Sequence, residues 1–180
     1  MSSIDPALSA VVALGVALLF AAAVLHKLAD WSRFRAALAG YRVAPDWLVP
    51  GVAVVVVVIE TVAAALLPLP ASRPAGALLA AGLLASYAVA IGVNLRRGRT
   101  SIDCGCFGPG ARNQIGPWMV IRNLLLAVVV LAAALPLTSR SLAPLDALTI
   151  GGAVTCLAIL YAAQEVLQRL TPRTTRSAGT

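Results

Sequence analysis

The stretch Leu48–Leu67, "LVPGVAVVVVVIETVAAALL", carries Glu60 as its single charged residue. A hydrocarbon core about 30 Å thick requires roughly 20 apolar residues at about 1.5 Å rise per residue, so this stretch is long enough to cross a membrane as a helix. Pro50 falls in the first turn, where proline is tolerated, and Pro68 and Pro70 follow as a stop. The stretch therefore predicts a transmembrane helix with a carboxylate inside it.

The composition of the whole chain agrees with a membrane protein. Of its 180 residues, 60% are hydrophobic and 12% are charged, whereas soluble domains have roughly 45–50% apolar and about 25% charged residues. The length allows one compact bundle and no large soluble domain beside it. We expect a single transmembrane domain over residues 1–170, followed by a flexible basic cytoplasmic tail over residues 171–180.

Four further apolar runs have the length of a membrane span. Only Asp5 precedes the first run with a charge, which is unlike the basic start of a signal peptide. The last run is weaker because Asp146 and two glycines interrupt its start. The predicted fold is an all-α integral membrane helical bundle with four to five transmembrane helices, and the further runs are Ala7–His26, Ala75–Leu95, Trp118–Leu135 and Pro144–Val166.

A short amphipathic segment separates the first two spans. Trp31, Phe34, Leu38 and Tyr41 recur at steps of three and four, and arginines occupy the other faces. This pattern predicts a short interfacial helix, with a partner-binding helix as the alternative.

Lysine and arginine are distributed unequally between the two sides of the predicted bundle. With five spans, the basic clusters that follow the first, third and fifth spans fall on one side, and only Arg73 and Arg140 fall on the other. Cytoplasmic loops collect such residues. The bias predicts a multi-pass protein of the cell membrane with an outside N-terminus, and it places Cys104 and Cys106 on the cytoplasmic side. The formal charge of +7 then reflects topology and attraction to the lipid bilayer, and no basic patch outside these flanks supports nucleic-acid binding.

The segment "TSIDCGCFGPGARNQIGPW", residues 100–118, holds two cysteines separated by one glycine. Gly105, Gly108 and Pro109 allow the tight bend that a disulfide between Cys104 and Cys106 requires. So small a ring is strained, and strained, exposed disulfides tend to be labile or catalytic. The spacing therefore favours a redox pair, Cys104 and Cys106, over a structural disulfide, which gains little from closing a short loop.

Two other interpretations of these cysteines stay open. One is a metal site made of Cys104, Cys106 and His26 and completed by Cys156 or Asp103, although structural zinc sites usually have four Cys or His ligands at paired spacings. The other is a pair of small, inert side chains packed under a loop.

Four more residues have two interpretations each. A carboxylate inside a span, as at Glu60, marks a proton, ligand or partner site by default, and its alternative is a hydrogen bond that holds two helices together. Cys156 is either filler inside the last span or a resolving thiol for the pair. His26 and Lys27 could favour a nearby thiolate by their positive charge, but for Lys27 we expect the ordinary basic flank of a span.

The pattern "HKLxD…F…Y…P" from His26 to Pro45, a second span with Glu60 at its centre, and "CGCFG" before the fourth span together resemble the MauE family, which is related to the DoxX-like membrane proteins. The similarity runs from the first span to the fourth. Its matching residues are Lys27, Phe34, Tyr41, Pro45, Glu60, Cys104, Gly105, Cys106, Phe107 and Gly108.

The resemblance implies a helper in methylamine utilisation that is required for maturation of the disulfide-rich small subunit of methylamine dehydrogenase. We therefore expect thiol–disulfide exchange at Cys104 and Cys106 with a partner protein, with a thioredoxin-like protein as a candidate second partner. Glu60 would contact a partner or a quinone, the candidate cofactor. The alternatives are a non-enzymatic DoxX-like subunit that binds a partner or quinone, and a small-solute transporter with Glu60 as its proton-coupled site.

Overall fold

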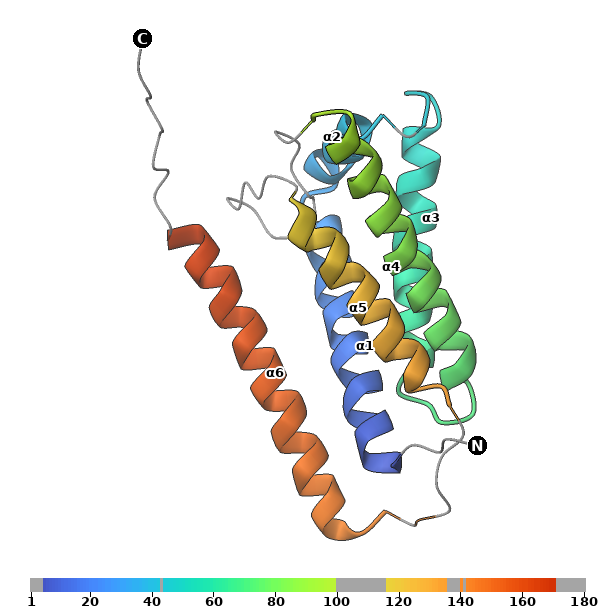
Figure 1. Cartoon of the computed structure of the whole chain (residues 1–180), viewed down its shortest axis with the longest axis vertical. Coiled ribbons are helices and arrows are strands. Elements are labelled where there is room, and N and C mark those ends of the chain that lie inside the picture. Colours follow the sequence, from blue (N-terminus) through green and yellow to red (C-terminus); the bar gives the residue numbers. More distant parts are fainter. Residues whose placement is uncertain (1–4, 43, 100–115, 136–139, 141, 171–180) are drawn as a thin grey trace.

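The computed structural model describes residues 5–42, 44–99, 116–135, 140 and 142–170, and every regular element within these ranges is a helix. The helices are α1 (Pro6–Ala29), α2 (Trp31–Gly40), α3 (Val49–Leu66), α4 (Arg73–Arg96), α5 (Pro117–Ala132) and α6 (Pro144–Leu170). Five long helices alternate in direction, and the short α2 lies across one end of the bundle (Figure 1). The predicted all-helical bundle with one short extra helix is confirmed.

Four helices are long and apolar enough to cross a membrane, among the residues described. They are α1, α3, α4 and the part of α6 from Pro144 to Ala163. The fourth predicted span, Trp118–Leu135, forms α5, which is apolar but has 16 residues and ends at Ala132. Four to five spans were expected, and the structure agrees with that range.

Local sequence explains where the helices begin and end. Asp5 caps α1 by accepting a hydrogen bond from the Ala7 amide at 2.8 Å. Proline lies in the first turn of α1, α3, α4 and α5, where its missing N–H costs nothing. Gly98, at a φ of +70°, ends α4 in the left-handed conformation that glycine adopts without strain.

The core is made of small side chains from four helices. Alanines at 0% exposure lie on α1, α3 and α4, and they surround the larger Phe20, which is 1% exposed. Small residues let helices approach closely where lipid supplies no hydrophobic driving force between them. Gly76 lies in a close contact, since a Cβ there would lie 3.0 Å from the backbone nitrogen of Leu67.

Helix α6 is the least enclosed of the long helices. It packs against α1 and leans away from the rest of the bundle toward its C-terminal end (Figure 1). Several of its large apolar side chains are more than half exposed, as lipid-facing residues of a membrane protein would be. These include Leu145, Leu148, Ile159, Leu160 and Val166.

Candidate functional site

The amphipathic helix α2 packs on the bundle with the face that its sequence predicted. Phe34 and, just after the helix, Tyr41 are buried, whereas Arg35 is exposed. Asp30 caps the helix by accepting from the Arg33 amide at 3.1 Å. The predicted amphipathic helix is confirmed, and it brings the ring of Phe34 to the end of α1.

Lys27 and Glu60 form an ion pair inside the bundle. Lys27 lies in the last turn of α1, and Glu60 lies in the second half of α3, which runs in the opposite direction (Figure 1). Because side chains tilt toward the N-terminus of their own helix, the lysine stem points back into the bundle and the glutamate points toward it. The two side chains are 4% and 1% exposed. Our prediction that Lys27 is an ordinary basic flank was wrong.

Aromatic side chains complete the surroundings of this pair. The hydroxyl of Tyr87, on α4, donates to Glu60 Oε1 at 2.7 Å, and Lys27 Nζ donates to the same hydroxyl at 3.3 Å. The lysine nitrogen also lies 5.3 Å from the ring centre of Phe34 and 5.4 Å from that of Tyr87. Ammonium groups over aromatic faces at such distances are attracted to the ring quadrupole. Three helices and α2 therefore supply one charged cluster.

A cavity of about 230 Å³ opens beside the ion pair. Its apolar wall includes Phe20 and Leu84, and its polar wall is drawn from five helices. Ionisable groups inside a membrane protein are rare and by default mark a functional site. The polar residues of the wall are Lys27, Glu60, Tyr87, Arg122, Asn123 and Tyr161.

At least two buried polar atoms on this wall have no hydrogen-bond partner among the described residues. They are Oε2 of Glu60 and Nδ2 of Asn123, on side chains whose residues are 1% and 3% exposed. Most buried polar atoms in proteins are paired, and an exception requires an explanation such as a bound molecule. These two atoms thus offer one hydrogen-bond acceptor and one donor to a guest.

Sequence reasoning singled out Glu60 but missed Tyr87, Arg122, Asn123 and Tyr161. The signal for two of them was present, because "RN" stands inside the otherwise apolar run "WMVIRNLLL", and polar residues inside a span call for an explanation. The tyrosines gave no comparable signal. For Glu60 itself, the predicted contact between helices exists as an ion pair, and a role in binding stays a prediction.

The thiol pair lies outside the described residues. The connection between α4 and α5 contains Asp103, Cys104 and Cys106. Two of the three ligands in the metal alternative therefore also lie outside the described residues. The third, His26, is partly buried at the end of α1. Within the described ranges no three His, Cys, Asp or Glu side chains gather to hold a metal ion, so that alternative stays untested. Cys156 is exposed on α6, and its role as a resolving thiol is likewise untested.

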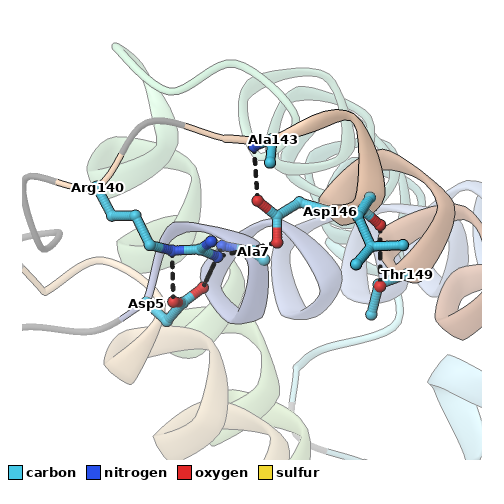
Figure 2. A network of polar contacts seen from close by, with 7 residues as sticks. Asp5, Ala7, Arg140, Ala143, Asp146 and Thr149 are labelled. Atoms are coloured by element: carbon cyan, nitrogen blue, oxygen red, sulfur yellow. Dashed lines mark hydrogen bonds and ion pairs between the residues drawn. The ribbon is translucent and has the colours of Figure 1, made fainter.

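The opposite end of the bundle carries a polar network of a different kind (Figure 2). Arg140 donates to Asp5 Oδ2 at 3.1 Å and to Asp146 Oδ1 at 2.9 Å, and Asp146 accepts from the Ala143 amide at 2.7 Å. The Arg140 guanidinium, with the Ala7 amide, holds the pKa of the Asp5 carboxyl below its usual range. Exposed pairs of this kind contribute little stability. The network joins the start of α1 to the start of α6 and has no cavity of its own among those described.

A second buried cation lies near that end. Arg73 Nη1 donates to Ser9 Oγ at 2.9 Å, Arg73 Nε donates to the Leu67 carbonyl at 3.3 Å, and Ser9 Oγ donates to the Ala133 carbonyl at 2.8 Å. These contacts satisfy carbonyls at the ends of α3 and α5. They hold helix ends together, which is a structural role.

Comparison with known proteins decides the family. The family model described as methylamine utilisation protein MauE matches residues 5–137. The chain belongs to the MauE family. The match includes Lys27 and Glu60 as well as the segment that contains Cys104 and Cys106.

Individual MauE proteins agree with this assignment. The methylamine utilization protein MauE of Methylophilus methylotrophus is 36% identical over 165 residues, which cover 91% of this chain and 87% of that protein. The MauE of Paracoccus denitrificans is 43% identical over 120 residues, 66% of this chain and 64% of that protein, so less than two thirds of the Paracoccus protein is matched. The MauE of Methylorubrum extorquens is 37% identical over 158 residues, 87% of this chain and 84% of that protein.

No solved structure matches this chain. As a member of the family described as methylamine utilisation protein MauE, with four described helices long and apolar enough to cross a membrane, the chain is a helical membrane protein. The predicted relation to DoxX-like proteins stays a prediction.

Proposed function

We propose that this protein assists the maturation of a disulfide-rich partner by thiol–disulfide exchange through Cys104 and Cys106. The observation that carries the proposal is the family match, which spans the "CGCFG" segment and the helices of the buried cluster in one continuous stretch. The strain expected of so small a ring also supports it, since strained disulfides exchange readily. The proposed partner is the small subunit of methylamine dehydrogenase, and a thioredoxin-like protein is the proposed second partner.

The exchange requires only the two cysteines Cys104 and Cys106 and one disulfide of the partner. One thiolate of Cys104 or Cys106 attacks a disulfide sulfur of the partner, and the other partner sulfur leaves as a thiolate. The second cysteine then closes the Cys104–Cys106 disulfide and releases the remaining partner thiol. The partner gains two electrons and two protons, the pair loses them, and the reverse sequence oxidises the partner.

Glu60 has a narrower role in this proposal than its sequence position suggested. Its carboxylate is 1% exposed, so a partner protein does not reach it in this conformation. A small molecule in the adjacent cavity does, since Glu60 lines that cavity. We therefore assign the partner contact to other parts of the chain and the small-molecule contact to Glu60.

The deciding experiment replaces the cysteines in cells that lack the native protein. The double variant Cys104→Ser with Cys106→Ser should abolish closure of the partner's disulfides, measured by alkylation and mass spectrometry, while the variant stays abundant in the membrane. Cys156→Ser is the matched control and should leave the partner oxidised as in wild type, because Cys156 is an exposed residue of α6. Full partner maturation with the double variant would overturn the proposal in favour of a non-enzymatic subunit.

The transporter alternative makes a different demand on the same strains. It requires a flux driven by a pH gradient that Glu60→Gln abolishes and the double cysteine variant leaves intact. A flux with that dependence would replace thiol exchange as the function.

A further inference from the structure

The polar cavity adjoins an apolar groove between α1, α5 and α6. The groove has a volume of about 570 Å³, and its wall is made of residues such as Val12, Val129 and Leu157. Leu19, Leu126 and Tyr161 line both spaces. A molecule could therefore place a polar head in the cavity and an apolar tail in the groove.

The position of the groove points to a ligand that comes from the lipid. Helix α6, which forms one wall, leans away from the bundle (Figure 1), and its residues Ile159 and Leu160 are 62% and 60% exposed. Ligand sites in helical proteins commonly lie between helices and are mostly apolar with a few placed polar groups. An amphipathic, membrane-dissolved molecule fits this arrangement.

The polar groups of the cavity restrict the chemistry of the head. Asn123 Nδ2 lacks an acceptor and Glu60 Oε2 lacks a donor among the described residues, so the head must accept one hydrogen bond and donate another. Among the described residues that line the wall, Lys27 and Arg122 are cations and Glu60 is an anion, and two nearby cations disfavour a cationic head. A neutral head with two oxygens, which are carbonyls in one oxidation state and hydroxyls in the other, can accept from Asn123 in either state and donate to Glu60 in the reduced one.

The volume agrees with a single ring. An engineered apolar cavity of about 150 Å³ holds benzene, and this cavity of about 230 Å³ leaves room for a ring with small substituents. Phe20 and Tyr87 on its wall supply aromatic surface for such a ring.

We propose that the cavity and groove bind a membrane quinone, with its head between Asn123 and Glu60 and its isoprenoid tail along α1 and α6. One quinone oxygen accepts from Asn123 Nδ2, and in the quinol form a hydroxyl donates to Glu60 Oε2. The role of the quinone as electron acceptor rests on the proposed function. Closure of a dithiol releases two electrons and two protons, and reduction of a quinone to a quinol takes up the same number. The binding site itself rests on the geometry of the helices alone.

The test measures binding of decylubiquinone to the full chain in lipid nanodiscs. Asn123→Leu removes the orphaned donor and should weaken binding at least fivefold, since the ligand oxygen that accepts from it would then be buried without a partner. Leu126→Trp fills the junction of cavity and groove and should abolish binding. Leu124→Trp, on the same helix but 47% exposed and outside both spaces, is the matched control and should bind as wild type.

Three outcomes would overturn the proposal. One is equal binding by all variants, which would mean partition into lipid. Another is unaltered binding by Asn123→Leu when its thermal unfolding shows a folded protein. The third is displacement of the probe by phosphatidylglycerol at equal concentration, which would make the occupant a phospholipid. The double variant Cys104→Ser with Cys106→Ser should bind decylubiquinone as wild type, so failure of the thiol proposal and failure of the quinone site are told apart.

Discussion

Removing the charge of Glu60 should destabilise the bundle by about 3 kcal/mol. Lys27 and Glu60 are 4% and 1% exposed, so Glu60→Gln leaves a buried ammonium without its counterion, a change that typically costs about 3–5 kcal/mol. The rings of Phe34 and Tyr87 stay 5.3 and 5.4 Å from that ammonium, and their attraction offsets part of the loss. Gln can still accept the hydrogen bond from Tyr87, so the loss of stability measures the effect of removing the charge.

A double-mutant cycle with Lys27→Met separates the ion pair from ordinary helix contacts. Unfolding in detergent mixtures should give a coupling energy of about 2 kcal/mol between the two positions, and the double variant should be more stable than Glu60→Gln alone. Thr61→Val is the control, since its exposed hydroxyl bonds only to its own helix, at the Val57 carbonyl, and it should change stability by less than about 0.5 kcal/mol. A coupling near 0.6 kcal/mol, the average for polar contacts between membrane helices, would refute the reasoning.

Three smaller predictions concern packing and the far end of the bundle. Gly76→Ala should cost about 1–3 kcal/mol, because its Cβ would lie 3.0 Å from the end of α3, whereas Gly82→Ala, with open space around it, should be neutral or stabilising by up to about 1 kcal/mol in the same unfolding assay. Ser9→Ala removes an acceptor from the buried Arg73 guanidinium and should cost about 1–3 kcal/mol. The pKa of Asp5 is lowered in the folded state. The ionised carboxyl therefore stabilises the folded protein fully above the usual Asp pKa of about 4, and this stabilisation is lost as the pH falls through the lower folded value. Hydrogen exchange at the Ala7 amide, which Asp5 caps, should therefore speed up in that acid range by more than the intrinsic exchange rate does. An unchanged rate relative to the intrinsic one would contradict the lowered pKa of Asp5.

The sequence alone predicted most of the helical framework. Uninterrupted apolar runs, prolines at their starts and basic residues at their ends are local signals, so the predicted spans Ala7–His26 and Leu48–Leu67 agree with α1 and α3 to within three residues. The last two spans differ at their C-terminal ends: α5 ends three residues before the predicted Leu135, and α6 continues four residues past Val166. A short apolar helix and a polar helix end give weak boundaries, because periodicity does not mark where either one stops.

The site was predictable only in part, for a geometric reason. A lysine at the end of an apolar run usually extends toward the membrane surface, and nothing along the chain says that Lys27 turns back to meet Glu60. That contact depends on two antiparallel helices whose side chains tilt toward each other. Arg122 and Asn123 could have been found as polar residues inside a span. Tyr87 and Tyr161 could not, because tyrosine in a membrane helix is ordinary.

The most direct test of the proposed function is a redox titration of the thiol pair in native membranes. Cys156→Ser provides a background in which Cys104 and Cys106 are the chain's remaining cysteines, and alkylation with a mass tag after equilibration at defined potentials counts their free thiols. Thiol exchange with a partner predicts that both thiols disappear together and reversibly, at a midpoint above about −300 mV, the rough limit for structural disulfides. A pair that stays reduced at every potential, or that opens only well below that limit, would contradict it.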